Sequence, residues 1–298
     1  MFMIPKISLK DLADNKKSTL NLLSDALSNH GFFVITDHKI PYTLFNEAYK
    51  YSEKFFNLDN LVKTKYSFRE HAGARGYTPF GKETALGETV PDLKEFWHHG
   101  PIVDKTFDKR ILKNIVVSEI DNFNNIFDKL FKEMNSLGLN LLSSISLTLD
   151  LPQDYFEQST KRGNSLLRLI HYPPSNNENM FRAREHADIN LITLLIGANE
   201  PGLEVKDKSG TWIPVSSSYE DIVCNIGDMM QLVTDQKLKS TPHRVVKYKN
   251  DELKSRYSIP FFMHPSPDTI LKSVFNTDDK GVLAHDFLDE RLKAIKLY

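Results

Sequence analysis

The sequence has little that would indicate a secreted, membrane-bound or nucleic-acid-binding protein. Its 298 residues include one cysteine, Cys224, so no internal disulfide can form. The 38 Lys and Arg residues are balanced by 39 Asp and Glu residues, whereas a nucleic-acid-binding domain usually carries a clustered basic excess. No apolar run approaches the roughly 18 residues of a membrane helix, and the N-terminus has no signal-peptide pattern. We therefore expect a cytoplasmic protein without nucleic-acid or membrane partners.

The sequence does contain enough apolar residues for a sizeable core, at 40% hydrophobic and 11% aromatic. Apolar residues recur at helical spacing in residues 11–29, 41–56 and 116–149, which predicts three helical segments. The short aromatic and β-branched run at residues 31–36 predicts a buried strand between the first two of them.

From residue 163 to residue 275 the pattern changes to short apolar runs separated by glycine, proline or polar clusters. This spacing is typical of a sandwich, jelly roll or barrel. The predicted fold is therefore α+β, with an N-terminal region (1–115) packed on a β core with its helices (116–298) as one compact unit. The tail at residues 285–298 predicts an amphipathic helix that covers a site or pairs with another chain.

Two histidines and a carboxylate could form a metal site. His186 and Asp188 stand two positions apart beside a strand-like run, and alternate residues of a strand point to the same face. His243, which begins another strand-like run, is the candidate third ligand. Such a triad leaves one side of the metal open, which suits non-haem Fe(II). Taken alone, His243 is better interpreted as a strand-end histidine that contacts backbone.

A second pair, Arg256 and Ser258, also stands at alternate positions of a strand-like run. A guanidinium and a hydroxyl on one face can bind a carboxylate. The simpler interpretation is an edge strand with an exposed arginine.

The order and spacing of these motifs closely resemble the isopenicillin N synthase-like family of Fe(II)- and 2-oxoglutarate-dependent oxygenases. The resemblance extends over roughly residues 4–270. It is carried by these segments: HGFFVITDHKIP (30–41), RGYTPFG (75–81), DLKEFWHHG (92–100), LLRLIHYPP (166–174), HAD (186–188), PGLEVKDKSGTWIPV (201–215), NIGDMMQLVTD (225–235), STPHRVV (240–246) and RYSIPFF (256–262).

The resemblance implies a double-stranded β-helix, or jelly-roll, core with supporting helices. It implies Fe(II) bound by His186, Asp188 and His243, with no catalytic residue beyond this metal centre. Arg256, Ser258 and Tyr172 would hold the distal carboxylate of 2-oxoglutarate. With O2, and with ascorbate as an optional reductant, such an enzyme hydroxylates, desaturates or cyclises a small molecule through a ferryl intermediate, releasing succinate and CO2.

Substrate-contacting residues are predicted from the N-terminal motifs and from positions beside the metal and carboxylate motifs, although each could serve only in packing. They are Tyr77, Phe80, Phe96, His98, Asn190 and Phe262. Two alternatives stay open: a 2-oxoglutarate-independent oxidase of the same family, cyclising or ascorbate-dependent, and a non-catalytic ligand-binding protein. The Arg-x-Ser pair does not separate the first alternative from the leading prediction. The sequence does not decide the substrate or the oligomeric state.

Overall fold

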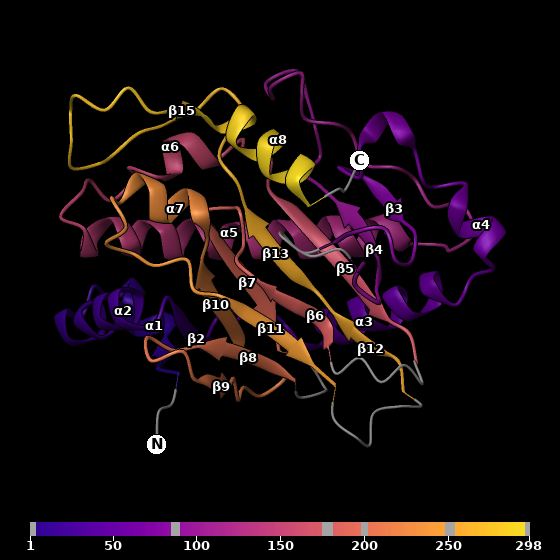
Figure 1. Ribbon diagram of the computed structural model, residues 1–298, viewed down its shortest axis with the longest axis horizontal. Helices are drawn as coiled ribbons and strands as arrows, with labels where there is room; N and C mark the ends of the chain where they lie inside the picture. The colour runs from indigo at the N-terminus through magenta and orange to yellow at the C-terminus, as the bar shows by residue number, and fades with distance from the viewer. Residues whose placement is uncertain (1–3, 85–89, 175–180, 198–201, 248–253, 296–298) are drawn as a thin grey trace.

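Two β-sheets stacked face to face form the centre of the molecule, and helices cover the outer face of the larger sheet (Figure 1). The computed structural model describes residues 4–84, 90–174, 181–197, 202–247 and 254–295. Within these ranges, no helix is long and apolar enough to cross a bilayer.

The large sheet draws strands from both halves of the chain, so the N-terminal region and the core share one sheet. Its strands pair antiparallel except for the parallel pair β1 and β2. In spatial order they are β1 (Lys6–Ser8), β2 (Phe32–Thr36), β10 (Ile222–Ile226), β7 (Ile192–Ile196), β13 (Pro260–Met263), β5 (Leu166–Tyr172), β4 (Glu95–His99) and β3 (Gly76–Thr78), with β12 (Arg256–Ser258) also paired to β5.

The small sheet is fully antiparallel and faces the large one. Its order is β6 (Phe181–His186), β11 (His243–Val246), β8 (Leu203–Lys206) and β9 (Trp212–Pro214). A separate two-stranded ribbon, β14 (Ile270–Leu271) and β15 (Val282–Leu283), leads into the C-terminal helix.

The long helix α5 is the main support of the large sheet, and the ring of its Phe131 lies 5.0 Å from that of Phe261 on β13. Helices α2 and α3 pack beside α5. The helices are α1 (Leu9–Ala13), α2 (Lys17–Asn29), α3 (Tyr42–Phe56), α4 (Asn60–Thr64), the 3-10 turn η1 (Arg69–His71), α5 (Phe123–Thr148), α6 (Glu157–Thr160), α7 (Asp228–Val233) and α8 (Ala284–Ala294).

One predicted strand is a helix in the structure. From the sequence, Gly227 and Asp228 predict a turn before a strand that carries Met229, Met230 and Leu232, but this run forms α7. Met229, Met230 and Val233 are buried while Leu232 is 39% exposed, and this spacing suits one face of a helical turn. A run of so few apolar residues does not separate the two periods by itself.

Strand β5 shows how the sheet separates the core from the site. Its Leu167 and Leu169 belong to the apolar cluster that the helices cover. The alternate residues Arg168, Ile170 and Tyr172 line a cavity on the other face, between the two sheets. This division follows from the two-residue period of a strand.

Candidate metal centre

The three predicted metal ligands meet where the chain crosses from the small sheet to the large one. His186 is the last residue of β6 and His243 the first of β11, and the two are register partners across the antiparallel pair. Asp188 lies in the connection between β6 and β7, which begins only at Ile192. The predicted continuous strand is therefore wrong at this point, because the crossover itself turns Asp188 toward the histidines.

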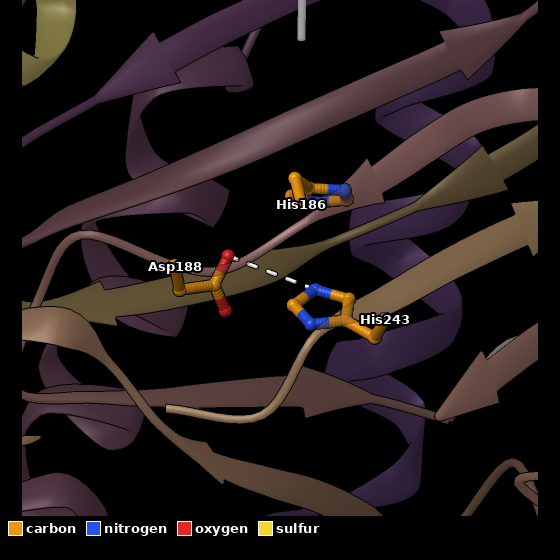
Figure 2. Close-up of side chains that lie close together, drawn as sticks. All are labelled: His186, Asp188 and His243. Atoms are coloured by element: carbon orange, nitrogen blue, oxygen red, sulfur yellow. Dashed lines mark ion pairs between the residues drawn. The ribbon is translucent and has the colours of Figure 1, made fainter. Parts of the chain in front are cut away.

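The geometry of the three side chains suits one cation. One potential ligand atom from each lies within 4.8 Å of the others. Asp188 Oδ1 is 3.8 Å from His243 Nε2, and the two imidazole centroids are 4.4 Å apart (Figure 2). Asp188 and His243 are buried, so a metal bound here is largely enclosed by protein.

Hydrogen bonds leave one ligand atom free on each imidazole. His186 Nδ1 donates to the carbonyl of Arg184 at 2.7 Å, and His243 Nδ1 lies 3.3 Å from the carbonyl of Thr241. Since a carbonyl only accepts, Nδ1 carries the proton in both bonds and Nε2 keeps its lone pair. Such outer contacts orient metal-binding histidines.

The Asp188 carboxylate is oriented in the same way by two residues that the sequence analysis did not single out. Its Oδ2 accepts from Thr193 Oγ1 at 2.6 Å and from Asn225 Nδ2 at 2.7 Å, which leaves Oδ1 toward the histidines. Thr193 and Asn225 are register partners on β7 and β10. Their signal in the sequence is one polar residue within each apolar strand, since a buried polar group requires a partner.

Protonation at neutral pH also suits a divalent metal. Burial, reinforced by the nearby His243, lowers the pKa of His186 to about 4. Burial would raise the pKa of Asp188, but the two histidines and the bonds from Asn225 and Thr193 outweigh it, and the net pKa lies below the usual value. A neutral imidazole and a carboxylate are the forms that bind metals, and this donor set matches non-haem Fe(II).

The predicted carboxylate site lies on β12 and β5. Arg256 and Tyr172 are register partners, and so are Ser258 and Ile170. The guanidinium Cζ is 5.4 Å from the centre of the Tyr172 ring. Arg256 is 2% exposed, and its Nε and Nη1 have no hydrogen-bond partner among the described residues. Because unpaired buried donors are costly, this site fits the distal carboxylate of 2-oxoglutarate.

A cavity of about 240 Å³ between the two sheets is lined by the three candidate metal ligands and by Tyr172 and Ser258. Three predicted substrate residues, His98, Asn190 and Phe262, line it. Asn190 also holds the turn after Asp188, because its Nδ2 donates to the carbonyl of Ile192 at 2.6 Å.

The other three predicted substrate residues, Tyr77, Phe80 and Phe96, are not among the described residues that line the cavity. Tyr77 is buried in the helix-covered core, where it donates to Glu95 at 2.5 Å, and Phe80 is 49% exposed. Phe96 does share a strand face with His98, but the Arg168 guanidinium lies 4.3 Å from the centre of its ring. The proximity of the motifs in the sequence could not show that the Arg168 side chain covers the Phe96 ring.

The C-terminal helix α8 forms part of the cavity wall, with Leu288, Arg291 and Leu292 among the lining residues. Arg291 lies 3.5 Å from Asp228, and the amide of Thr84 donates to the carbonyl of Ile295 at 3.2 Å. The sequence left two roles open for the tail, covering a site or pairing with another chain. These contacts within the chain agree with the first role.

Comparison with known proteins agrees with this geometry. Residues 163–265 match the 2OG-Fe(II) oxygenase superfamily, and residues 4–116 match the N-terminal region of the non-haem dioxygenases described from morphine synthesis. The proline hydroxylase buaE of Petromyces alliaceus is 31% identical over 89% of this chain and 87% of its own length. The 2-oxoglutarate-dependent dioxygenase gloF of Glarea lozoyensis is 31% identical over 84% of this chain and 83% of its own length.

Solved structures show the same fold over almost the whole chain. A 2OG-Fe(II) oxygenase family protein from Caulobacter crescentus has a TM-score of 0.86 and 35% identity, covering 98% of this chain and 99% of its own. A full-length Neurospora crassa protein in complex with alpha-KG has the same TM-score at 25% identity, covering 98% and 96%. The predicted α+β fold with a jelly-roll core is thus confirmed. The chain belongs to the isopenicillin N synthase-like family of the 2OG-Fe(II) oxygenases, as a dioxygenase that uses Fe(II) and 2-oxoglutarate on small molecules.

Proposed function

We propose that this enzyme hydroxylates a small organic molecule, with His186, Asp188 and His243 as the Fe(II) ligands and Arg256, Ser258 and Tyr172 as the 2-oxoglutarate site. The observation that carries the proposal is the buried Arg256 guanidinium. Its Nε and Nη1 have no partner among the described residues, and its strand neighbours Tyr172 and Ser258 line the same cavity as the metal triad. A permanent cation is the suitable partner for a buried carboxylate.

When bound, iron and 2-oxoglutarate supply the oxidising chemistry, so the work of the chain is binding, orientation and exclusion of water. The free Nε2 and Oδ1 atoms of the triad would hold the metal. Thr193, Asn225 and the two backbone carbonyls keep these atoms oriented. Helix α8 forms part of the cavity wall, where it would keep water from a bound substrate.

Hydroxylation of a small molecule is supported by the relatives. One is named a proline hydroxylase, and the Neurospora crassa protein has also been crystallised with alpha-KG and thymine together. The cavity, at about 240 Å³, lies below the usual range of drug-sized sites. Desaturation, ring closure or a 2-oxoglutarate-independent oxidation would use the same metal triad, and product analysis separates them.

An anaerobic titration tests the proposal. Fe(II) is added to the metal-free protein, followed by 2-oxoglutarate, and the visible spectrum is recorded. We expect a metal-to-ligand charge-transfer band on the second addition, and succinate release once O2 is admitted. If iron binds while 2-oxoglutarate produces neither band nor succinate, the proposal is wrong and the 2-oxoglutarate-independent oxidase is favoured.

A further inference from the structure

Apart from the metal-ligand candidate Asp188, the described residues that line the cavity have an excess of positive charge. Four cations, Arg75, Lys94, Arg168 and Arg291, line it against three carboxylates, Glu83, Asp92 and Asp228. The metal end, in contrast, is balanced once occupied. Fe(II) and Arg256 carry three positive charges, and Asp188 and 2-oxoglutarate carry three negative ones.

The charges of this region form an alternating chain. Lys94 lies 2.6 Å from Glu83 and 3.0 Å from Asp92. Glu83 also pairs with Arg168 at 3.1 Å, and Asp92 lies 3.8 Å from Arg184. Each carboxylate is therefore shared by two cations. Glu83 is therefore ionised. Burial would raise its pKa, but Arg168 and Lys94 outweigh burial, and the net pKa is far below normal.

Arg75 increases the imbalance without binding a ligand itself. It is 1% exposed and donates to the carbonyls of Leu112 and Ala74 and to the amide oxygen of Asn164. Its guanidinium fills the space where a side chain at Gly100 would begin, at 2.2 Å. It is thus a rigid part of the wall whose charge none of these uncharged acceptors neutralises.

Arg168 differs from Arg75 because some of its guanidinium donors are not used by any described residue. Its Nε donates to His98 Nε2 at 2.6 Å and its Nη1 pairs with Glu83. Its Cζ lies 4.3 Å from the centre of the Phe96 ring and 5.4 Å from that of Phe262. Nη2 makes no hydrogen bond to any residue that the structure describes, so its two N–H donors are available. The four neighbours just named hold the guanidinium in place.

His98 is the positioning residue for the Arg168 guanidinium. Its ring lies 2.6 Å from the carbonyl of Gly73 through Nδ1, which must be the protonated nitrogen. Nε2 is then an acceptor that faces Arg168. Burial, together with the charge of Arg168, lowers the pKa of His98 well below normal, so the ring stays neutral and keeps accepting.

His264 is another residue of the cavity lining whose side chain has an unpaired polar atom, as far as the structure describes the chain. His264 is buried, and its Nδ1 has no hydrogen-bond partner among the described residues. Burial lowers its pKa to about 4, so it offers a neutral nitrogen rather than a further charge.

We propose that Arg168 binds a carboxylate of the substrate, so that this enzyme acts on a small organic monocarboxylate. The inference rests on the proposed function, because it assigns 2-oxoglutarate to the Arg256 end. Arg168 and Tyr172 stand four residues apart on one face of β5, roughly 13 Å along the strand. The two carboxylates thus bind at separate arginines, and the substrate extends from Arg168 toward the metal triad. A single remaining charge matches one carboxylate better than a doubly charged phosphate.

Matched acid and amide probes test this assignment in the anaerobic Fe(II)–2-oxoglutarate complex of the full chain. The probes are acetate, benzoate, phenylacetate and L-proline, each paired with its primary amide, at up to 50 mM. Binding is followed by calorimetry and by the shift of the charge-transfer band. We expect at least one acid to bind and its amide to bind roughly 10- to 150-fold more weakly, as loss of a charge-assisted bond implies.

Variants then locate the preference. Arg168→Gln should abolish it while the band formed with 2-oxoglutarate alone stays unchanged. Because Arg168→Gln leaves Glu83 with one cation fewer, Arg168→Met combined with Glu83→Gln removes the pair together. His98→Gln should weaken acid binding several-fold without affecting the amide, an asymmetry that a merely structural role of His98 would not produce.

The outcomes separate the two proposals. The inference is overturned if no acid binds, if acid and amide bind equally, or if the preference survives in both Arg168 variants. A preference that is lost in Arg256→Gln but not in Arg168→Gln would assign the probe to the co-substrate site, and this too refutes the inference. Absence of the 2-oxoglutarate band in the unmodified protein would instead refute the proposed function.

Discussion

Replacement of Arg256 by methionine should weaken 2-oxoglutarate binding strongly without harming the empty protein. Arg256 is 2% exposed, and its Nε and Nη1 have no partner among the described residues. Its removal therefore breaks no hydrogen bond of these two atoms. Apolar replacement of buried charges is often neutral or stabilising by about 1–4 kcal/mol.

The bound state should respond in the opposite way. Loss of one partner of a buried, hydrogen-bonded charge pair costs about 2–5 kcal/mol. The Kd for 2-oxoglutarate should therefore rise roughly 30- to 4,000-fold. Ser258→Ala removes only a neutral hydroxyl and should cost about 1 kcal/mol, or roughly fivefold.

Two measurements on the same variants check this pair of expectations. Anaerobic titration of the charge-transfer band gives the Kd, and thermal unfolding of the metal-free protein gives the Tm. Arg110→Met is the matched control, because Arg110 is a surface arginine paired with Asp108. A Kd within threefold of the unmodified protein, or a Tm lowered by more than about 5 °C, would show that Arg256 serves the fold rather than the co-substrate.

The remaining predictions concern the metal and the pH dependence of stability. Asp188→Ala should abolish stoichiometric Fe(II) binding. Thr193→Val removes one hydrogen bond to Asp188 Oδ2 and should weaken Fe(II) binding about 10- to 100-fold. Both are measured by anaerobic titration with iron analysis, and equal Fe(II) affinities in both variants and the unmodified protein would contradict the metal assignment. For His264, burial lowers the folded-state pKa to about 4 against 6.5 in the unfolded chain, so the unfolded state takes up its proton first as the pH falls. The stability contributed by the neutral ring is complete above pH 6.5 and is lost as the pH falls toward 4, by about 2 kcal/mol between pH 7 and pH 5. Urea unfolding of the metal-free protein gives the free energy of unfolding at these two pH values. In His264→Gln its decrease from pH 7 to pH 5 should be smaller by this amount, and an unchanged decrease would refute the assignment to His264.

Local patterns in the sequence were sufficient for much of the fold, whereas the candidate metal ligands followed from the resemblance that several motifs carry together. The helical spacing of residues 41–56 predicted α3 (Tyr42–Phe56), and the run at residues 31–36 predicted β2 (Phe32–Thr36). His186, Asp188 and His243 were recognisable because metal binding demands particular residue types in a particular order. Alternation along a short strand likewise placed Arg256 and Ser258 on one face.

The sequence by itself thus determined the family, the ligand types and the periodic elements, since these depend on neighbours within a few residues or on a motif order. The tertiary structure alone decided which groups serve those ligands. Thr193 and Asn225 reach Asp188 because β7 pairs with β10 in one register. Arg168 covers Phe96 because β4 pairs with β5, and α8 returns to the cavity from the far end of the chain. Register and return paths are set by the packing of the whole core, which no local window of sequence contains.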